Sequence, residues 1–190
     1  MTAALELGSS SIRSLRREDD VLKSRTSRCV YAVLPDSPAH QRLLEQCGLH
    51  FTTCEDGILL LGDGAYDNAE LFKSPCLPLM VGGRIPKGNP LVRQLISSLV
   101  EVILPIASSR NEASSRNEIC ALTLPGGAAL DSSSEARADL EFYIRLVKLQ
   151  GYEPKLVPAS QALILAELVE NAFTGIGIVF GASGCEAILA

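Results

Sequence analysis

Two short turns of glycine and small residues are the parts of this sequence best suited to bind an anion. The first turn consists of Gly8, Ser9, Ser10 and Ser11, and the second of Gly181, Ala182, Ser183 and Gly184. Glycine adopts positive φ angles freely and has no side chain that would hold an anion away from the backbone. Successive N–H groups in such a turn can therefore face a phosphate group, so phosphate binding is the first chemistry to consider.

The two turns have similar surroundings in the sequence. Each lies between two runs of strand-forming residues, which is the pattern of a β-hairpin. Residues 5–15 can be aligned with residues 178–188 so that strand matches strand and turn matches turn. A single turn of this kind is more often structural, so the phosphate hypothesis rests on the pair.

The composition is that of a folded soluble domain. Of the 190 residues, 47% are hydrophobic and 21% are charged, which suits one domain of ordinary size or one lobe of a larger protein. The formal net charge of −5 is spread along the chain without long acidic or basic blocks. This pattern argues against a broad nucleic-acid interface, and we expect no nucleic-acid partner.

The start of the chain and its apolar runs bear on its location. No basic segment followed by an apolar stretch opens the sequence. No apolar run approaches the roughly 20 residues that a membrane-spanning helix needs. We therefore expect a cytoplasmic protein without a membrane-spanning segment.

The cysteines and histidines show no spacing that is typical of a metal site. There are six cysteines and two histidines, and no two cysteines form a C-x-x-C pair. We interpret the cysteines as buried free thiols.

The first third of the sequence predicts strands and one short helix. Residues 3–7 and 12–17 should form the first hairpin, and residues 29–34 should add a third strand to it. Ser37 followed by Pro38 is a helix start signal, because Ser can cap and Pro fits the first helical position. Gly48 should end this helix.

The middle of the chain predicts a small excursion and then a long helix. Residues 49–54 and 58–61 look like short strands, followed by a connection through residues 62–88 that is rich in Pro and Gly. We expect residues 36–88 to form a small sub-domain over one edge of the main sheet. Pro90 then opens a helix with one apolar face, which should end near residues 105–107.

The last part of the chain alternates strand and helix after a short repeat. The repeat, at residues 107–118, is interpreted as a surface loop. Two strands are predicted at 119–124 and 152–157, and two helices at about 135–150 and 159–171. Short strand-helix-strand connections indicate parallel neighbours. The fold class is therefore α/β, a ribonuclease H-like mixed sheet flanked by helices, with the first strands antiparallel and later ones parallel.

In this order of elements, the chain resembles the first, N-terminal lobe of the actin-like ATPases, the superfamily of actin, bacterial MreB and ParM, and the Hsp70 chaperones. Residues 5–15 are similar to that family's first phosphate motif, usually Asp-x-Gly followed by small or hydroxyl residues. Residues 178–188 are similar to its second, usually Asp-x-Gly-Gly-Gly. Residues 150–167 look like the connecting segment, in which a strand leads through Pro158 into an Ala-rich helix.

The resemblance implies a site for ATP and Mg²⁺. In that family, the two hairpins grip the β- and γ-phosphates of ATP, and an acidic residue of the first motif binds the magnesium ion, usually through water. Glu6 stands at this acidic position and would be the magnesium residue. The phosphate-facing residues would be Gly8, Ser9, Ser10, Ser11, Gly181, Ala182, Ser183 and Gly184.

The sequence also departs from the family pattern. Val179 stands at the acidic position of the second motif, and Val157 stands just before Pro158, where several relatives have a Glu that orients the attacking water. Valine can neither bind a metal nor position water. Gln161 is the candidate substitute and so the one candidate catalytic residue, although a plain exposed helix residue is the simpler interpretation.

Relatives continue with a second lobe that completes the nucleotide cleft, whereas this sequence stops at Ala190. We therefore expect residues 1–190 to form a single first lobe with the second lobe absent, so that the partner is a second lobe or another copy of the chain. Two functions stay open. One is a lobe that binds Mg-ATP with weak or no hydrolysis, and the other is a non-catalytic actin-like protein that acts in assembly or partner binding.

Other enzyme classes lack their motifs. The P-loop pattern G-x-x-x-x-G-K-[ST] and the nucleophile elbow G-x-S-x-G are both missing from the sequence. A nuclease on the same type of sheet would need several acidic residues around two metal ions, and Glu6 is the only carboxylate at the expected strand.

Overall fold

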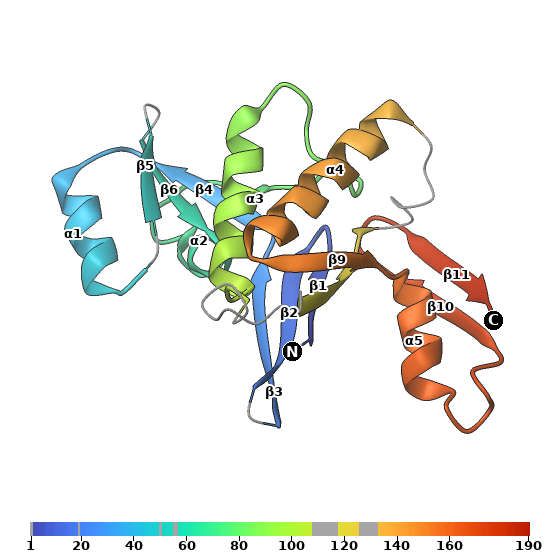
Figure 1. Cartoon of the computed structure of the whole chain (residues 1–190). Helices are drawn as coiled ribbons and strands as arrows, with labels where there is room; N and C mark the ends of the chain where they lie inside the picture. The colour runs from blue at the N-terminus through green and yellow to red at the C-terminus, as the bar shows by residue number, and fades with distance from the viewer. Residues whose placement is uncertain (1, 19, 50, 55–56, 108–117, 126–132) are drawn as a thin grey trace.

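The computed structural model describes residues 2–18, 20–49, 51–54, 57–107, 118–125 and 133–190. Figure 1 shows the course of the chain, with a central sheet, a small outlying sheet and a separate C-terminal hairpin. Most of the short repeat at 107–118 lies outside the described residues, as does His50. None of the described helices is both long and apolar enough to cross a membrane.

The central sheet has the strand order β3-β2-β1-β8-β9. Its strands are β1 (Thr2–Leu7), β2 (Ser11–Glu18), β3 (Val21–Arg28), β8 (Glu118–Thr123) and β9 (Tyr152–Leu156). β2 is antiparallel to both β1 and β3, whereas β8 is parallel to both β1 and β9. The predicted mixed α/β sheet is therefore confirmed.

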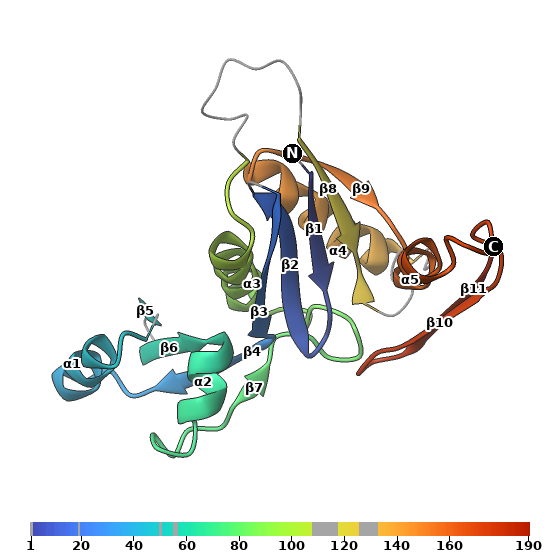
Figure 2. The same ribbon diagram turned by 90° about the horizontal axis from the view of Figure 1, so that it is seen from below.

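Helices α3 (Pro90–Ile103) and α4 (Ser134–Leu149) lie across one face of this sheet, above it in Figure 1 and behind it in Figure 2. The apolar face predicted for α3 is buried against the sheet. Ser133 caps α4, its Oγ accepting a hydrogen bond of 3.2 Å from the N–H of Ala136. Both helices therefore form where apolar spacing and start signals predict them.

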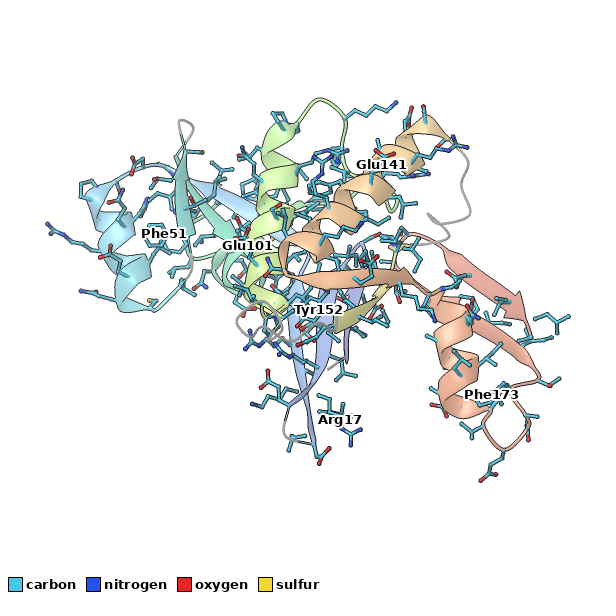
Figure 3. All side chains as sticks on the ribbon, viewed as in Figure 1. Arg17, Phe51, Glu101, Glu141, Tyr152 and Phe173 are labelled. Carbon is cyan, nitrogen blue, oxygen red and sulfur yellow. The ribbon has the colours of Figure 1, made fainter. Side chains whose placement is uncertain are left out.

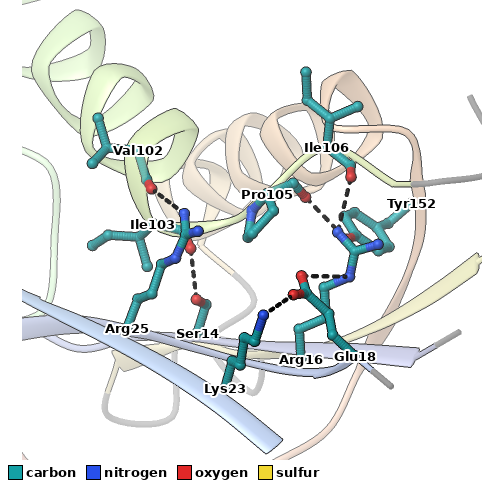
Figure 4. Close-up of polar contacts among 10 residues, drawn as sticks. All are labelled: Ser14, Arg16, Glu18, Lys23, Arg25, Val102, Ile103, Pro105, Ile106 and Tyr152. Atoms are coloured by element: carbon teal, nitrogen blue, oxygen red, sulfur yellow. Dashed lines mark hydrogen bonds and ion pairs between the residues drawn. The ribbon is translucent and has the colours of Figure 1, made fainter. Parts of the chain in front are cut away.

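The C-terminal end of α3 is fixed by side chains from the sheet (Figure 4). Ser14 Oγ donates to the carbonyl of Ile103 at 2.7 Å, and Arg25 Nη1 donates to that of Val102 at 3.0 Å. Just beyond the helix, Arg16 Nη1 donates to the carbonyl of Ile106 at 3.0 Å. The last carbonyls of a helix have no partner within it, so these donors satisfy them and place positive charge at the negative helix end.

Residues 30–78 contain a second, smaller sheet. Its strand order is β5-β6-β4-β7, made of β5 (Phe51–Cys54), β6 (Gly57–Leu61), β4 (Val30–Leu34) and β7 (Leu77–Pro78). Helices α1 (Pro38–Gln46) and α2 (Gly62–Asn68) accompany it. A small apolar cluster around Leu34, Leu44 and Leu60 holds this unit together. Ser37 caps α1 as predicted, accepting from the N–H of His40.

Two predicted elements in this region are wrong. Residues 29–34 do not extend the first hairpin, because β3 is its third strand and residues 30–34 form β4 of the small sheet. β3 is almost entirely exposed and polar, so its sequence has no apolar alternation to reveal it, and backbone pairing with the long β2 holds it in place. Helix α2 was missed because Gly62 and Gly64 resemble a loop.

The C-terminal hairpin is not part of the central sheet. β10 (Ile176–Phe180) and β11 (Cys185–Leu189) form a two-stranded sheet of their own, with α5 (Ala159–Glu167) packed on one face. Gly177 permits this packing, because a Cβ at that position would lie 2.3 Å from the carbonyl oxygen of Ser160. The predicted hairpin and the predicted helix before it are both confirmed, and both project from one side of the molecule (Figures 1 and 2).

We expect Leu5→Ala to destabilise the protein by about 2–5 kcal/mol, because Leu5 lies on the central strand with 1% of its surface exposed, and truncation leaves a cavity. The free energy of unfolding in urea measures this effect. Leu22→Ala is the matched control, since Leu22 on β3 is 65% exposed. Equal losses in the two variants would contradict the described core.

Candidate functional site

The two glycine-containing turns meet in space. The turn between β1 and β2 lies next to the turn between β10 and β11 (Figure 2), although 174 positions separate Ser9 from Ser183 in the sequence. The hydroxyl oxygens of these two serines are 2.6 Å apart and share a hydrogen bond. The pair that the sequence suggested is therefore a single spatial feature.

A cavity of about 270 Å³ lies between the turns. Every residue of the two predicted turns lines it, together with Glu6, Leu7, Arg13, Thr123, Leu124, Pro125, Ala159, Val179, Phe180 and Glu186. The carboxyl end of β8 contributes Thr123, so the cavity sits at the end of the central parallel strands. This end of an open α/β sheet is where ligands commonly bind.

Both turns are closed in the same way. The N–H of Gly8 donates to the carbonyl of Ser11 at 2.9 Å, and the N–H of Gly181 donates to that of Gly184 at 2.8 Å. The first glycine of each turn also lies close to the facing carbonyl. A Cβ at Gly8 would lie 2.8 Å from the oxygen of Ser11, so even alanine would force this turn to shift.

Glu6 and Arg13 provide opposite charges at the cavity. They are cross-strand partners on β1 and β2, and Arg13 Nη1 lies 3.7 Å from Glu6 Oε2. Both side chains remain about half exposed, 47% for Glu6 and 58% for Arg13, so this ion pair is open to solvent. Sequence reasoning missed Arg13, although the register of a tight hairpin places it opposite Glu6.

Glu186 is a second carboxylate at the cavity that sequence reasoning missed. Its Oε1 accepts a hydrogen bond of 2.8 Å from the N–H of Ser160 and another from the hydroxyl of the same serine. Helix α5 has no cap from its own flanking residue Pro158, so Glu186 takes that role from the neighbouring strand. Glu186 pairs across the hairpin with Val179, the position where the family motif is acidic.

A third segment approaches the second turn. Residues 81–84 form a tight turn, in which the backbone groups of Val81 and Arg84 exchange hydrogen bonds of 2.9 and 3.1 Å. Gly83 in this turn has φ of +78°, and a Cβ there would lie 3.1 Å from Ser183 Oγ. A left-handed backbone and close contact both favour glycine, which lets the segment pack against the second hairpin.

The remaining predicted residues lie in different surroundings. Val179 lines the cavity, as the alignment of the two hairpins implies. Val157 donates its N–H to the carbonyl of Leu122 at 3.0 Å and is not among the lining residues. Gln161 is exposed on α5 and also lies outside the lining, so its catalytic role stays a prediction.

The donor set suits an anion. Serine hydroxyls, the glycine-containing backbone and one guanidinium group are the usual partners of phosphate in proteins. Among the described residues, no group of three or more His, Cys, Asp or Glu side chains could hold a metal ion by itself. The carboxylates of Glu6 and Glu186 could at most complete the shell of a cation that arrives with a phosphate.

Comparison with models of protein families identifies the family of this chain. A family model described as Volactin matches residues 1–190, which is the full sequence. The chain belongs to the Volactin family. No curated protein matches it.

The fold of this Volactin chain is similar to that of MamK, an actin-like filament protein. A structure of the MamK double helical filament matches with a TM-score of 0.54 and 11% identity, covering 100% of this chain and 55% of that chain. A non-polymerising MamK mutant bound to AMPPNP matches with a TM-score of 0.50 and 11% identity, covering 100% of this chain and 54% of that one. The predicted resemblance to an actin-like lobe is confirmed at the level of fold, and the chain spans about half the length of these structures.

We expect Glu186→Ala to destabilise the start of α5, because the N–H of Ser160 loses its acceptor. Loss of a helix cap costs about 0.5–2 kcal/mol. Hydrogen exchange of the Ser160 amide, followed by NMR, measures this effect locally, and urea unfolding measures it globally. The control is Glu167→Ala at the other end of the same helix, which should leave Ser160 protected. Unchanged exchange at Ser160 in the Glu186 variant would disprove the capping role.

Proposed function

We propose that this chain binds the phosphate chain of Mg-ATP between its two hairpin turns. The observation that carries the proposal is the contact of Ser9 with Ser183, which brings both turns to one cavity. The fold adds support, since one of the similar MamK structures was solved with AMPPNP bound. The site residues of this proposal are Gly8, Ser9, Ser10, Ser11, Gly181, Ala182, Ser183 and Gly184.

The size of the cavity suits the phosphates better than a whole nucleotide. Its volume of about 270 Å³ lies below the roughly 300–1,000 Å³ that is usual for small-molecule sites. The adenosine group would then extend beyond the surface of this lobe. A second lobe or another copy of the chain would cover it, which is consistent with the greater length of the MamK chains.

The charged side chains at the cavity support the binding of a hydrated magnesium ion together with phosphate. Arg13 is the cation available to a phosphate oxygen, and Glu6 would bind Mg²⁺ through water once Arg13 turns to the phosphate. Mg²⁺ in nucleotide sites usually keeps several waters and has one or two carboxylates besides the phosphates. The ion would neutralise phosphate charge.

We propose weak or absent hydrolysis. Attack on the γ-phosphate needs a polar group that orients water, and Val157 and Val179 cannot do this. Gln161 is the proposed substitute, but it is exposed on α5 and would have to approach the cavity by a movement of that helix. Binding without efficient turnover is therefore the expected behaviour.

We expect Arg13→Gln to weaken the binding of Mg-ATP by about tenfold, because the cavity loses its cation and about 1.4 kcal/mol of binding free energy. Isothermal titration calorimetry measures the dissociation constant. Arg17→Gln is the matched control, since Arg17 lies on the same strand, faces Asp20 and is remote from the turns (Figure 3). Absence of heat at millimolar nucleotide would remove the proposal, and so would equal effects of the two variants.

A second candidate function is assembly without catalysis, and an exposed apolar face favours it. The outer face of the C-terminal hairpin, opposite α5, consists of Ile176, Ile178, Phe180, Cys185, Ala187 and Leu189, all exposed. Phe180 and Leu189 are 82% and 78% exposed. Nearby Phe173, beyond the end of α5, is also solvent-exposed (Figure 3). Two-stranded hairpins are marginally stable alone, so this face gains from being covered.

We expect the wild-type chain to associate with increasing concentration, independently of nucleotide, and Leu189→Asp to abolish the association by placing a charge on this face. Sedimentation velocity over a concentration series measures the effect. The control is Leu22→Asp, because Leu22 is similarly exposed but lies on β3. A wild-type chain that stays monomeric throughout, or equal behaviour of both variants, would contradict assembly through the hairpin.

A further inference from the structure

A second cavity lies away from the turns. It has a volume of about 700 Å³ and is bounded by residues 84–90 and by the first turns of α3 and α4. Its lining residues are Val81, Arg84, Ile85, Pro86, Lys87, Gly88, Asn89, Pro90, Arg93, Glu135, Ala138 and Asp139. The volume falls within the usual range of roughly 300–1,000 Å³ for sites that bind small organic molecules.

The charges of this cavity favour an anion. Arg84, Lys87 and Arg93 line it, against the carboxylates of Glu135 and Asp139. These carboxylates already have cationic partners, because Lys87 Nζ lies 2.6 Å from Glu135 Oε1 and Arg93 Nη2 lies 2.7 Å from Asp139 Oδ1. With these two ion pairs, the lining still has one more basic than acidic side chain, and this excess of positive charge favours an anionic over a cationic ligand.

The cavity also lies at the positive ends of two helices. α3 and α4 both begin beside it, and both run downward from the same end of the molecule in Figure 1. The N-terminal ends of both helices therefore contribute positive electrostatic potential near this cavity. Asn89 makes no side-chain capping bond to α3, in contrast to Ser133 at the start of α4.

The wall of the cavity is held rigidly by Asp139, which is buried. Besides the bond to Arg93, Asp139 Oδ2 accepts a hydrogen bond of 3.4 Å from the N–H of Ile85. The guanidinium of Arg93 also stacks over the ring of Phe142 at 4.8 Å from its centre. The basic group therefore has a fixed position, which reduces the entropy lost when a ligand binds.

Apolar surface accompanies the charge. Ile85, Pro86, Pro90 and Ala138 line the cavity beside the basic residues. A bare inorganic anion would leave this surface without contact, while a neutral apolar molecule would not use the cations. We propose that the cavity binds a small organic anion with an apolar body.

This site is separate from the proposed nucleotide site, although the two share one structural element. Val81 and Arg84 line the large cavity, while Gly83 of the same tight turn contacts Ser183 at the second hairpin. No residue lines both cavities. Failure of nucleotide binding would therefore leave this proposal standing, and the reverse also holds.

An NMR titration with naphthalene-2-sulfonate tests the proposal. We expect saturable shifts of backbone amides in residues 84–93 and 135–139. Neutral 2-naphthol and inorganic sulfate should each bind at least about tenfold more weakly, because 2-naphthol lacks the negative charge and sulfate lacks the apolar body. Lys87→Gln, at a side chain that is 75% exposed, should keep the fold and weaken binding severalfold.

A cavity-filling variant gives the matched comparison. Ala138→Leu should abolish the shifts, because the larger side chain fills part of the cavity. Ala166→Leu, on the exposed side of α5, should leave the shifts unchanged. The proposal is overturned if the shifts fall on β10 and β11 instead, if sulfate or 2-naphthol binds as tightly as the sulfonate, or if the Ala138 and Ala166 variants behave alike.

Discussion

The parallel pairing of β1 with β8 is the interaction on which the rest of the molecule depends. It joins Ala4 to Ala121 and Leu5 to Leu122, and so connects the N-terminal meander to the half of the chain that alternates strand and helix. Both strands end at the same edge of the sheet, where β1 delivers the first glycine turn and β8 leads to Pro125. Without this pairing, the two turns would belong to independent hairpins.

The elements that could be predicted from the sequence are those whose signals are local. The cap Ser37, the apolar face of α3 and the glycine turns each follow from short-range chemistry. β3 could not be predicted, because its stability comes from pairing with β2 and not from its own apolar pattern. Arg13 and Glu186 were missed for a related reason, since cross-strand register decides what lies beside each cavity residue.

The two ends of α3 illustrate how one helix serves two purposes. At its C-terminal end, Arg25 binds a carbonyl of the last turn, and Arg16 binds one in the segment that follows, so the sheet holds this end firmly. At its N-terminal end, Asn89 makes no side-chain capping bond, and Asn89, Pro90 and Arg93 line the larger cavity. The helix is thus anchored where its dipole is negative and available to solvent where it is positive.

The free cysteines have a practical consequence for measuring movement in this chain. Burial raises the pKa of the Cys29 and Cys120 thiols to about 12, which leaves almost no reactive thiolate at neutral pH. Cys47 and Cys185 are exposed, so the expectation of buried thiols is wrong for these two. They lie on the two parts of the chain that project in opposite directions from the central sheet (Figure 1). A pair of fluorescent or spin labels placed at these two native thiols would report the distance between the small outlying sheet and the C-terminal hairpin.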